Sequence, residues 1–145
     1  MQVTLFTDYS FRVLMYLGMN EGRRCTTSEI SGRYRISRNH VVKVVHNLAK
    51  LGYIKSAKGR GGGIALLKKP NDINLRDLLI ALEPDLDLVE CFNSARNTCR
   101  IVGACGLKGI WGEALSAFLD VMGQYTLADT VAKPKIFHSI MGDGA

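Results

Sequence analysis

Three of the four cysteines in this 145-residue chain lie within fifteen positions, in the stretch CFNSARNTCRIVGAC at residues 91–105. Thiolates are soft ligands, and three of them select an iron–sulfur cluster, zinc or copper(I). Structural zinc sites usually contain a C-x2–4-C pair, whereas seven and five residues separate Cys91, Cys99 and Cys105. This spacing suits a loop around a bulkier group and favours an iron–sulfur cluster, with zinc or reduced structural thiols as alternatives. Cys25 lies far away and is expected to be an unligated thiol.

Iron–sulfur clusters usually take four protein ligands, so a fourth ligand has to be found. His40 and His46 fall in a helix predicted to end at residue 51, and His138 lies in a weakly patterned end segment. Asp87 and Glu90 are close to the cysteines in sequence. The residue types alone therefore leave the fourth ligand open.

Positive charge is concentrated in the first half of the chain. Residues 1–70 hold 13 Lys and Arg against 3 Asp and Glu, a net charge of +10, whereas residues 71–145 hold 6 against 10, a net charge of −4. The two values add up to the +6 of the whole chain. A basic half of this size favours double-stranded DNA or another polyanion as partner, and a solvated basic surface is the alternative.

The first 70 residues carry the pattern of a winged helix-turn-helix domain. A first helix is predicted over residues 8–20, and a capping box formed by Thr26 and Glu29 predicts a second to residue 34. Ser37 caps a third helix, predicted to end at residue 51, and Val41, Val44, Val45 and Leu48 share one face of it. Two short strands, residues 53–57 and 64–67, flank the glycine-rich segment KGRGGG, which predicts a hairpin.

The third helix and the hairpin tip carry the side chains expected to contact DNA. The second helix of a helix-turn-helix enters the major groove with its N-terminal residues, where arginine reads guanine and asparagine reads adenine. Basic residues before this helix and at the hairpin tip are expected on phosphates or in the minor groove. The candidate contacts are Arg33, Arg35, Ser37, Arg38, Asn39, His40, Lys43, Lys58 and Arg60.

A linking segment and a dimerisation helix are expected after the DNA-binding domain of residues 1–70. Residues 71–106 hold a predicted helix at 75–82 and the cysteine loop, and residues 107–132 hold a long helix at 107–123. Its apolar residues recur at intervals of 4, 3, 4, 3 and 4, which is typical of a seam against a partner helix. Packing onto the same chain is the alternative, and residues 133–145 are expected to form a loosely ordered tail. The seam consists of Leu107, Trp111, Ala114, Phe118, Val121 and Tyr125.

Several function classes find no support in the sequence. No apolar run is long enough to cross a bilayer, and the first residues do not resemble a secretion signal, so a cytoplasmic protein is expected. No G-x-S-x-G, H-E-x-x-H or nucleotide-binding glycine motif occurs, which argues against an enzyme. GRGGG is no phosphate-binding loop, since neither Gly-Lys-Ser/Thr nor a predicted helix follows it.

Taken together, these stretches resemble the iron–sulfur winged-helix transcriptional repressors over almost the whole chain. SRNH, LEP and YTLAD are most similar to the nitric-oxide-sensing branch of that family. The seven-residue first cysteine interval is longer than is typical of the family. The stretches that carry the resemblance are TDYSFRVLMYL at 7–17, SRNHVVKVVHNLAKLGYI at 37–54, KGRGGGIAL at 58–66, LEPDLDLVEC at 82–91 and YTLAD at 125–129.

The resemblance implies a homodimer that represses transcription while it carries a cluster on Cys91, Cys99 and Cys105. It implies a [4Fe–4S] cluster in preference to [2Fe–2S], with Asp8 of the other subunit as fourth ligand. Nitric oxide would then be the effector that relieves operator binding. A regulator of cluster supply or redox state, and an iron–sulfur electron-transfer accessory protein, are the alternatives.

Overall fold

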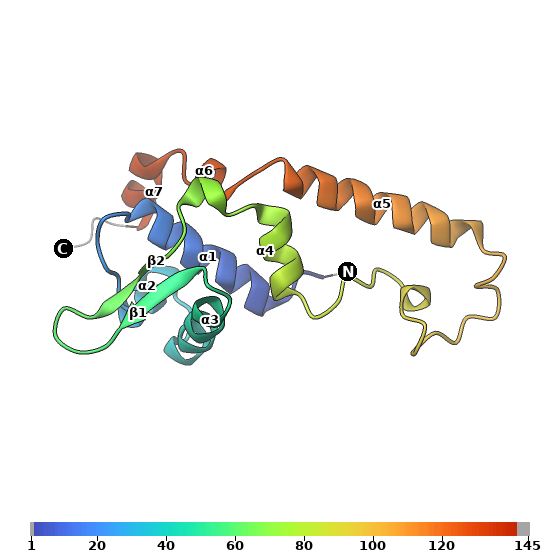
Figure 1. Cartoon of the computed structure of the whole chain (residues 1–145), viewed down its shortest axis with the longest axis horizontal. Helices are drawn as coiled ribbons and strands as arrows, with labels where there is room; N and C mark the ends of the chain where they lie inside the picture. Colours follow the sequence, from blue (N-terminus) through green and yellow to red (C-terminus); the bar gives the residue numbers. More distant parts are fainter. Residues whose placement is uncertain (1, 142–145) are drawn as a thin grey trace.

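The computed structural model describes residues 2–141 and consists mainly of helices around one small hairpin (Figure 1). This confirms the predicted class, a winged helix-turn-helix followed by a long C-terminal helix. No helix among the described residues is both long and apolar enough to cross a membrane. In chain order the elements are α1 (Leu5–Met19), α2 (Thr27–Tyr34), α3 (Arg38–Lys50), β1 (Ile54–Ala57), β2 (Gly63–Leu66), η1 (Pro70–Asp72), α4 (Leu75–Leu82), η2 (Glu90–Phe92), α5 (Gly106–Gly123), α6 (Leu127–Thr130) and α7 (Pro134–Met141).

Local capping sets the helix-turn-helix. The Thr26 hydroxyl accepts a hydrogen bond from the Glu29 amide and the Glu29 carboxylate accepts one from the Thr26 amide, so the predicted capping box starts α2. Arg35 ends α2 in the left-handed conformation, with φ 54° and ψ 38°. Ser37 then caps α3, because its hydroxyl accepts a hydrogen bond from the His40 amide at 3.3 Å.

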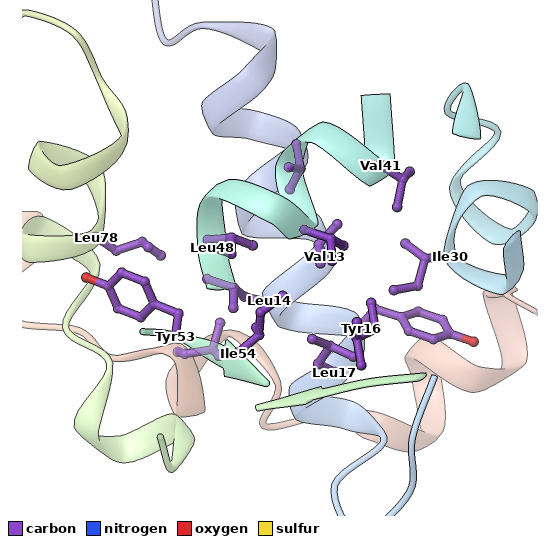
Figure 2. Close-up of a cluster of buried hydrophobic side chains, with 14 of the residues drawn as sticks. Val13, Leu14, Tyr16, Leu17, Ile30, Val41, Leu48, Tyr53, Ile54 and Leu78 are labelled. Atoms are coloured by element: carbon purple, nitrogen blue, oxygen red, sulfur yellow. The ribbon is translucent and has the colours of Figure 1, made fainter. Parts of the chain in front are cut away.

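The core lies between α1, α2, α3, α4 and the inner face of the hairpin (Figure 2). α1 runs through its middle and buries Val13, Leu14 and Leu17 completely or almost completely. The predicted apolar face of α3 is buried against it, as Val41 and Leu48 in Figure 2 illustrate. Burial of a side chain of this size contributes about 1.5–3 kcal/mol, so this packing stabilises the position of α3 against α1.

The wing is a two-stranded antiparallel hairpin in which Ile54 pairs with Leu66 and Ala57 with Gly63. Each strand begins and ends within one residue of its predicted bounds. A side chain at Gly62 would lie 2.5 Å from the Ala57 carbonyl oxygen, so the tight tip needs a glycine at this position. Cys25, which precedes α2 in the sequence, forms an isolated antiparallel bridge with Ile64, and this bridge connects the segment before α2 to the wing.

The start of α1 differs from the predicted start at residue 8. The helix begins at Leu5, and Thr4 is its cap, with a side-chain oxygen that accepts a hydrogen bond from the Thr7 amide at 3.2 Å. Asp8 therefore lies in the first turn of α1, and Thr4 is the capping residue. A carboxylate in this position still interacts favourably with the positive end of the helix dipole.

The long helix α5 projects away from the winged domain (Figure 1). Its C-terminal end packs on α4, where Asn74 donates a hydrogen bond to the Gly123 carbonyl at 2.8 Å and Arg76 pairs with Asp120 at 3.2 Å. None of its 18 residues, all within the described part of the chain, is buried. Packing onto the same chain therefore involves only one end of the helix.

The expectation of a loosely ordered tail from residue 133 is wrong for residues 134–141, which form α7. Phe137 packs edge to face on Tyr16 and Tyr34, with ring centroids 6.5 and 6.2 Å apart. Arg33 also donates a hydrogen bond to the Met141 carbonyl at 2.6 Å. Residues 142–145 of the predicted tail lie outside the described residues.

Candidate DNA-binding surface and cysteine loop

The N-terminal end of α3 presents its polar side chains to solvent. Arg38, Asn39, His40 and Lys43 are exposed, while the opposite face of the helix is buried. Ser37 is exposed too, but its hydroxyl oxygen is used for capping, which leaves the hydroxyl hydrogen free to donate. This surface can supply donors and acceptors to base edges without unfolding any part of the domain.

His40 also contacts α1. Its ring lies 5.9 Å from the ring of Tyr9, measured between centroids, with the planes tilted by 38°. Sequence reasoning placed His40 only on the DNA-facing side and gave no partner for it. The contact makes His40 a link between α1 and the DNA-reading helix.

The two arginines of the turn have different surroundings. Arg33 is half-buried, and its guanidinium donates to the C-terminal end of α7 as described above. Arg35 is exposed and holds the left-handed position between α2 and α3. Of the two, Arg35 is therefore the one whose charge is directed to solvent at the helix-turn-helix surface.

The wing adds a second basic surface. Lys58 and Arg60 are exposed at its tip. Arg24, which the sequence did not single out, reaches the same tip and donates to the Gly61 carbonyl at 3.5 Å. It could not have been found by pattern, because the pairing of Cys25 with β2 that places it is a contact across the sequence.

The three clustered cysteines are free, half-buried thiols on the loop that joins α4 to α5. Cys91 lies in the short η2 turn, and the amide of Cys99 donates to the Asn97 side chain at 3.0 Å. Cys105 is the residue directly before the first turn of α5. Within residues 2–141, the structure does not gather three or more Cys, His, Asp or Glu side chains into a metal-binding group.

Acidic residues next to the cysteines are used to hold the loop together. The Arg96 guanidinium lies 3.2 Å from carboxylate oxygens of both Asp85 and Asp87. Asp87 also accepts a hydrogen bond from the Asn93 side chain at 3.0 Å, and Glu90 accepts one from Thr98 at 3.4 Å. These pairs compete with any ligand role for Asp87 and Glu90.

Asp8 lies on α1 and forms an ion pair with Arg12, one turn later, at 2.7 Å. Its side chain is 40% exposed, so it is accessible from outside the chain. The start of α1 is in turn joined to the root of the cysteine loop, because the Thr4 amide donates to the Glu83 carboxylate at 2.8 Å. The loop and the Asp8 helix are thus connected within one chain, although Asp8 is not grouped with the cysteines.

One charged network stiffens the end of the domain away from α5. Arg23 hydrogen-bonds to Glu29 and holds the pKa of this carboxyl at about 2, helped by Tyr16 and the Thr26 amide. Burial raises the pKa of the Cys25 thiol to about 11, so it stays protonated at neutral pH. A buried, protonated thiol agrees with the expectation that Cys25 binds no metal.

Comparison with known proteins supports this arrangement. The family model Rrf2, described as "Iron-dependent Transcriptional regulator", matches residues 3–133. The chain is 48% identical over 132 residues to the HTH-type transcriptional regulator NsrR of Shouchella clausii, covering 90% of this chain and 89% of that protein. It is 44% identical to the protein of the same name in Bacillus subtilis, with 90% of each covered.

Solved structures show the same fold. The structure described as T. potens IscR superposes with a TM-score of 0.74 at 22% identity, covering 99% of this chain and 94% of that one. CymR, the global cysteine regulator of B. subtilis, superposes with a TM-score of 0.74 at 20% identity, covering 91% and 97%. The resemblance inferred from the sequence is confirmed, and the chain belongs to the Rrf2 family of transcriptional regulators.

Proposed function

We propose that this protein is a homodimeric transcriptional repressor that binds its operator while carrying an iron–sulfur cluster and releases it in response to nitric oxide. The observation that carries the proposal is the combination, in one chain, of an exposed DNA-reading helix end with three free thiols on a loop whose first residue, Glu83, is hydrogen-bonded to Thr4 at the start of α1. Relatives named as HTH-type transcriptional regulators support the DNA-binding part. Nitric oxide is the effector expected from the sequence resemblance.

DNA binding would use α3 and the wing together. Arg38 and Asn39 would read base edges, and Lys43, Arg35, Lys58 and Arg60 would contact phosphates or the minor groove. Base contacts should make affinity depend on sequence by about 1–3 kcal/mol per pair, whereas phosphate contacts should make it depend on salt.

Dimerisation would cover the exposed seam of α5. Leu107, Trp111 and Val121 are 55%, 40% and 52% exposed in the single chain. Helices in proteins are stabilised mostly by packing of their apolar face, so an exposed apolar seam of this size needs a partner, and a second copy also explains paired operator half-sites. Trp111→Lys should therefore yield monomers with weak operator binding. A wild-type protein that sediments as a monomer at micromolar concentration would contradict this part of the proposal.

The donor set fits a cluster, since Cys91, Cys99 and Cys105 are free, half-buried thiols on one loop. Asp8 of the other subunit would complete the set, and [4Fe–4S] is preferred over [2Fe–2S]. When bound, the cluster supplies iron that nitric oxide can ligate. A carboxylate is a harder ligand than a thiolate, which makes Asp8 the weakest of the four protein ligands.

The chain's own residues offer two positions for the Asp8 carboxylate. It can bind outward as a ligand, or it can pair with Arg12 as it does in the single chain. A release of Asp8 would let this ion pair form, and α1 contacts the DNA-reading helix through Tyr9 and His40. A coupling of about 1–3 kcal/mol between the two sites would change operator affinity about 5- to 150-fold.

The test is operator affinity of the anaerobically purified dimer before and after stoichiometric nitric oxide, with absorbance, iron and sulfide measured on the same samples. Cys91→Ala, Cys99→Ala and Cys105→Ala should each lose both the cluster and tight binding. Cys25→Ala is the matched control and should keep both. Unchanged affinity after the cluster absorbance has gone would favour a supply- or redox-sensing regulator, and a holo-protein that binds no DNA would favour an electron-transfer protein.

A further inference from the structure

A basic pocket lies beside the wing tip, and Arg24 is the one of its residues that was described above with the tip. It has a volume of about 330 Å³ and is formed by the end of α1, the segment that leads to α2 and the outer side of the hairpin. Five of its lining residues are basic and one, Glu21, is acidic. The basic residues are Arg23, Arg24, Lys55, Lys68 and Lys69.

Two of these five cations have partners inside the chain. Arg23 pairs with Glu29 at 2.5 Å, and the ammonium group of Lys68 lies 4.7 Å from the centroid of the Tyr53 ring. No ion pair within residues 2–141 neutralises the remaining three, Arg24, Lys55 and Lys69, and all three are exposed. The pocket therefore holds an excess of positive charge that its own residues do not balance.

The pocket is fixed to the wing. The amide of Cys25 donates to the Ile64 carbonyl at 2.9 Å, and the Ile64 amide donates back at 2.8 Å. The backbone of Gly63 passes so close that a side chain there would lie 3.1 Å from the Arg24 Cβ. Since Arg24 also reaches Gly61 at the tip, the pocket is placed alongside the tip.

We propose that Arg24, Lys55 and Lys69 bind backbone phosphates of the operator on the outer flank of the minor groove that the wing tip approaches. The proposal rests on the proposed DNA-binding function and extends its footprint by one basic surface in each subunit. An arginine can hold two phosphate oxygens at once, whereas the two lysines act as point charges. Such contacts carry no base information, so they should strengthen binding to every flanking sequence alike.

The experiment compares operator binding of the holo-dimer and of an Arg24→Gln, Lys55→Gln double variant as a function of salt. Each lost phosphate contact should lower the slope of log affinity against log salt by about 0.9. Between 50 and 200 mM salt this corresponds to about 3.5-fold less loss of affinity per contact. Lys108→Gln is the matched control, because Lys108 is an exposed lysine in the first turn of α5. This helix projects away from the wing (Figure 1).

Two operator duplexes of different length test where on the DNA the proposed phosphate contacts lie. One ends where the wing tip meets the minor groove, and the other continues on each side by about half a helical turn, roughly five base pairs. Wild-type protein and Lys108→Gln should bind the longer duplex more tightly, and the double variant, which keeps only Lys69 of the three cations, should lose most of this gain. The inference would be overturned if the longer duplex raised the affinity of the double variant as much as that of the wild-type protein. It would also be overturned if the double variant had a lower slope of log affinity against log salt on the shorter duplex as well. Either result would leave the proposed function standing. A wild-type holo-protein that binds neither duplex would overturn both.

Discussion

Arg35→Gly should separate the folding role of the turn from its role in DNA binding. Arg35 is the one residue other than glycine with a positive φ in the described part of the chain, and it directly precedes the buried Ile36. Within residues 2–141 its side chain forms no ion pair, while its amide donates to the end of α2. The left-handed backbone of Arg35 serves the turn between α2 and α3, whereas its side-chain charge would serve DNA binding.

The size of the effect follows from the backbone. A residue with a Cβ pays about 1–2 kcal/mol in the left-handed region, and glycine avoids this cost. Glycine loses about 0.5–1 kcal/mol more chain entropy on folding than alanine. Arg35→Gly should therefore be about 0.5–1 kcal/mol more stable than Arg35→Ala, although both remove the same charge.

The assay is urea unfolding of both variants at one fixed protein concentration, since a dimer's midpoint depends on concentration. In parallel, both should bind the operator more weakly, with a salt slope lower by about 0.9, and Arg35→Lys should recover most of this. If Arg35→Ala were as stable as Arg35→Gly, the argument from backbone strain would be wrong. If the salt slope did not change, Arg35 would not contact a phosphate.

Two further predictions concern stability. The low pKa of Glu29 means that its pairing with Arg23 stabilises the fold fully above about pH 4.5, and that this contribution disappears as the pH falls towards 2. The difference in urea midpoint between wild type and Glu29→Gln should therefore be constant above pH 5 and shrink below it, and a difference that stays constant would contradict the pairing. Phe137→Ala should cost about 2 kcal/mol and expose α7 to proteases, whereas Ile140→Ala, at a side chain 75% exposed, should do neither.

Much of the fold could be predicted because its signals are local. The Thr26 capping box, the Ser37 cap and the four-residue apolar face of α3 each follow from spacing within one or two turns. The start of α1 was missed because Thr4 and Thr7 are both good capping residues, and only the structure shows which one accepts the hydrogen bond. The helix α7 was missed because the partners of Phe137 come from α1 and α2, more than 100 positions earlier.

The candidate site divides in the same way. Residue type and order predict Cys91, Cys99 and Cys105 as ligands, since three soft ligands on one loop are a local pattern, and their role stays a prediction. The bond of Arg33 to α7 and the position of Arg24 beside the wing depend on tertiary contacts, which no spacing encodes. A ligand donated by a second subunit would be harder still to predict, because no spacing within one chain encodes a contact between two chains.

The position of α1 gives the proposed switch its physical basis. At its N-terminal end, Thr4 is hydrogen-bonded to Glu83 at the root of the cysteine loop, and in its first turns Asp8 and Tyr9 face different partners. Further along, its buried residues pack on α3. A helix is stiff over this length, so a displacement at the loop or at Asp8 would reach His40 by moving α1 as a unit. Because the packed core resists gradual deformation, the outcome would be a change between two settings of the DNA-reading helix.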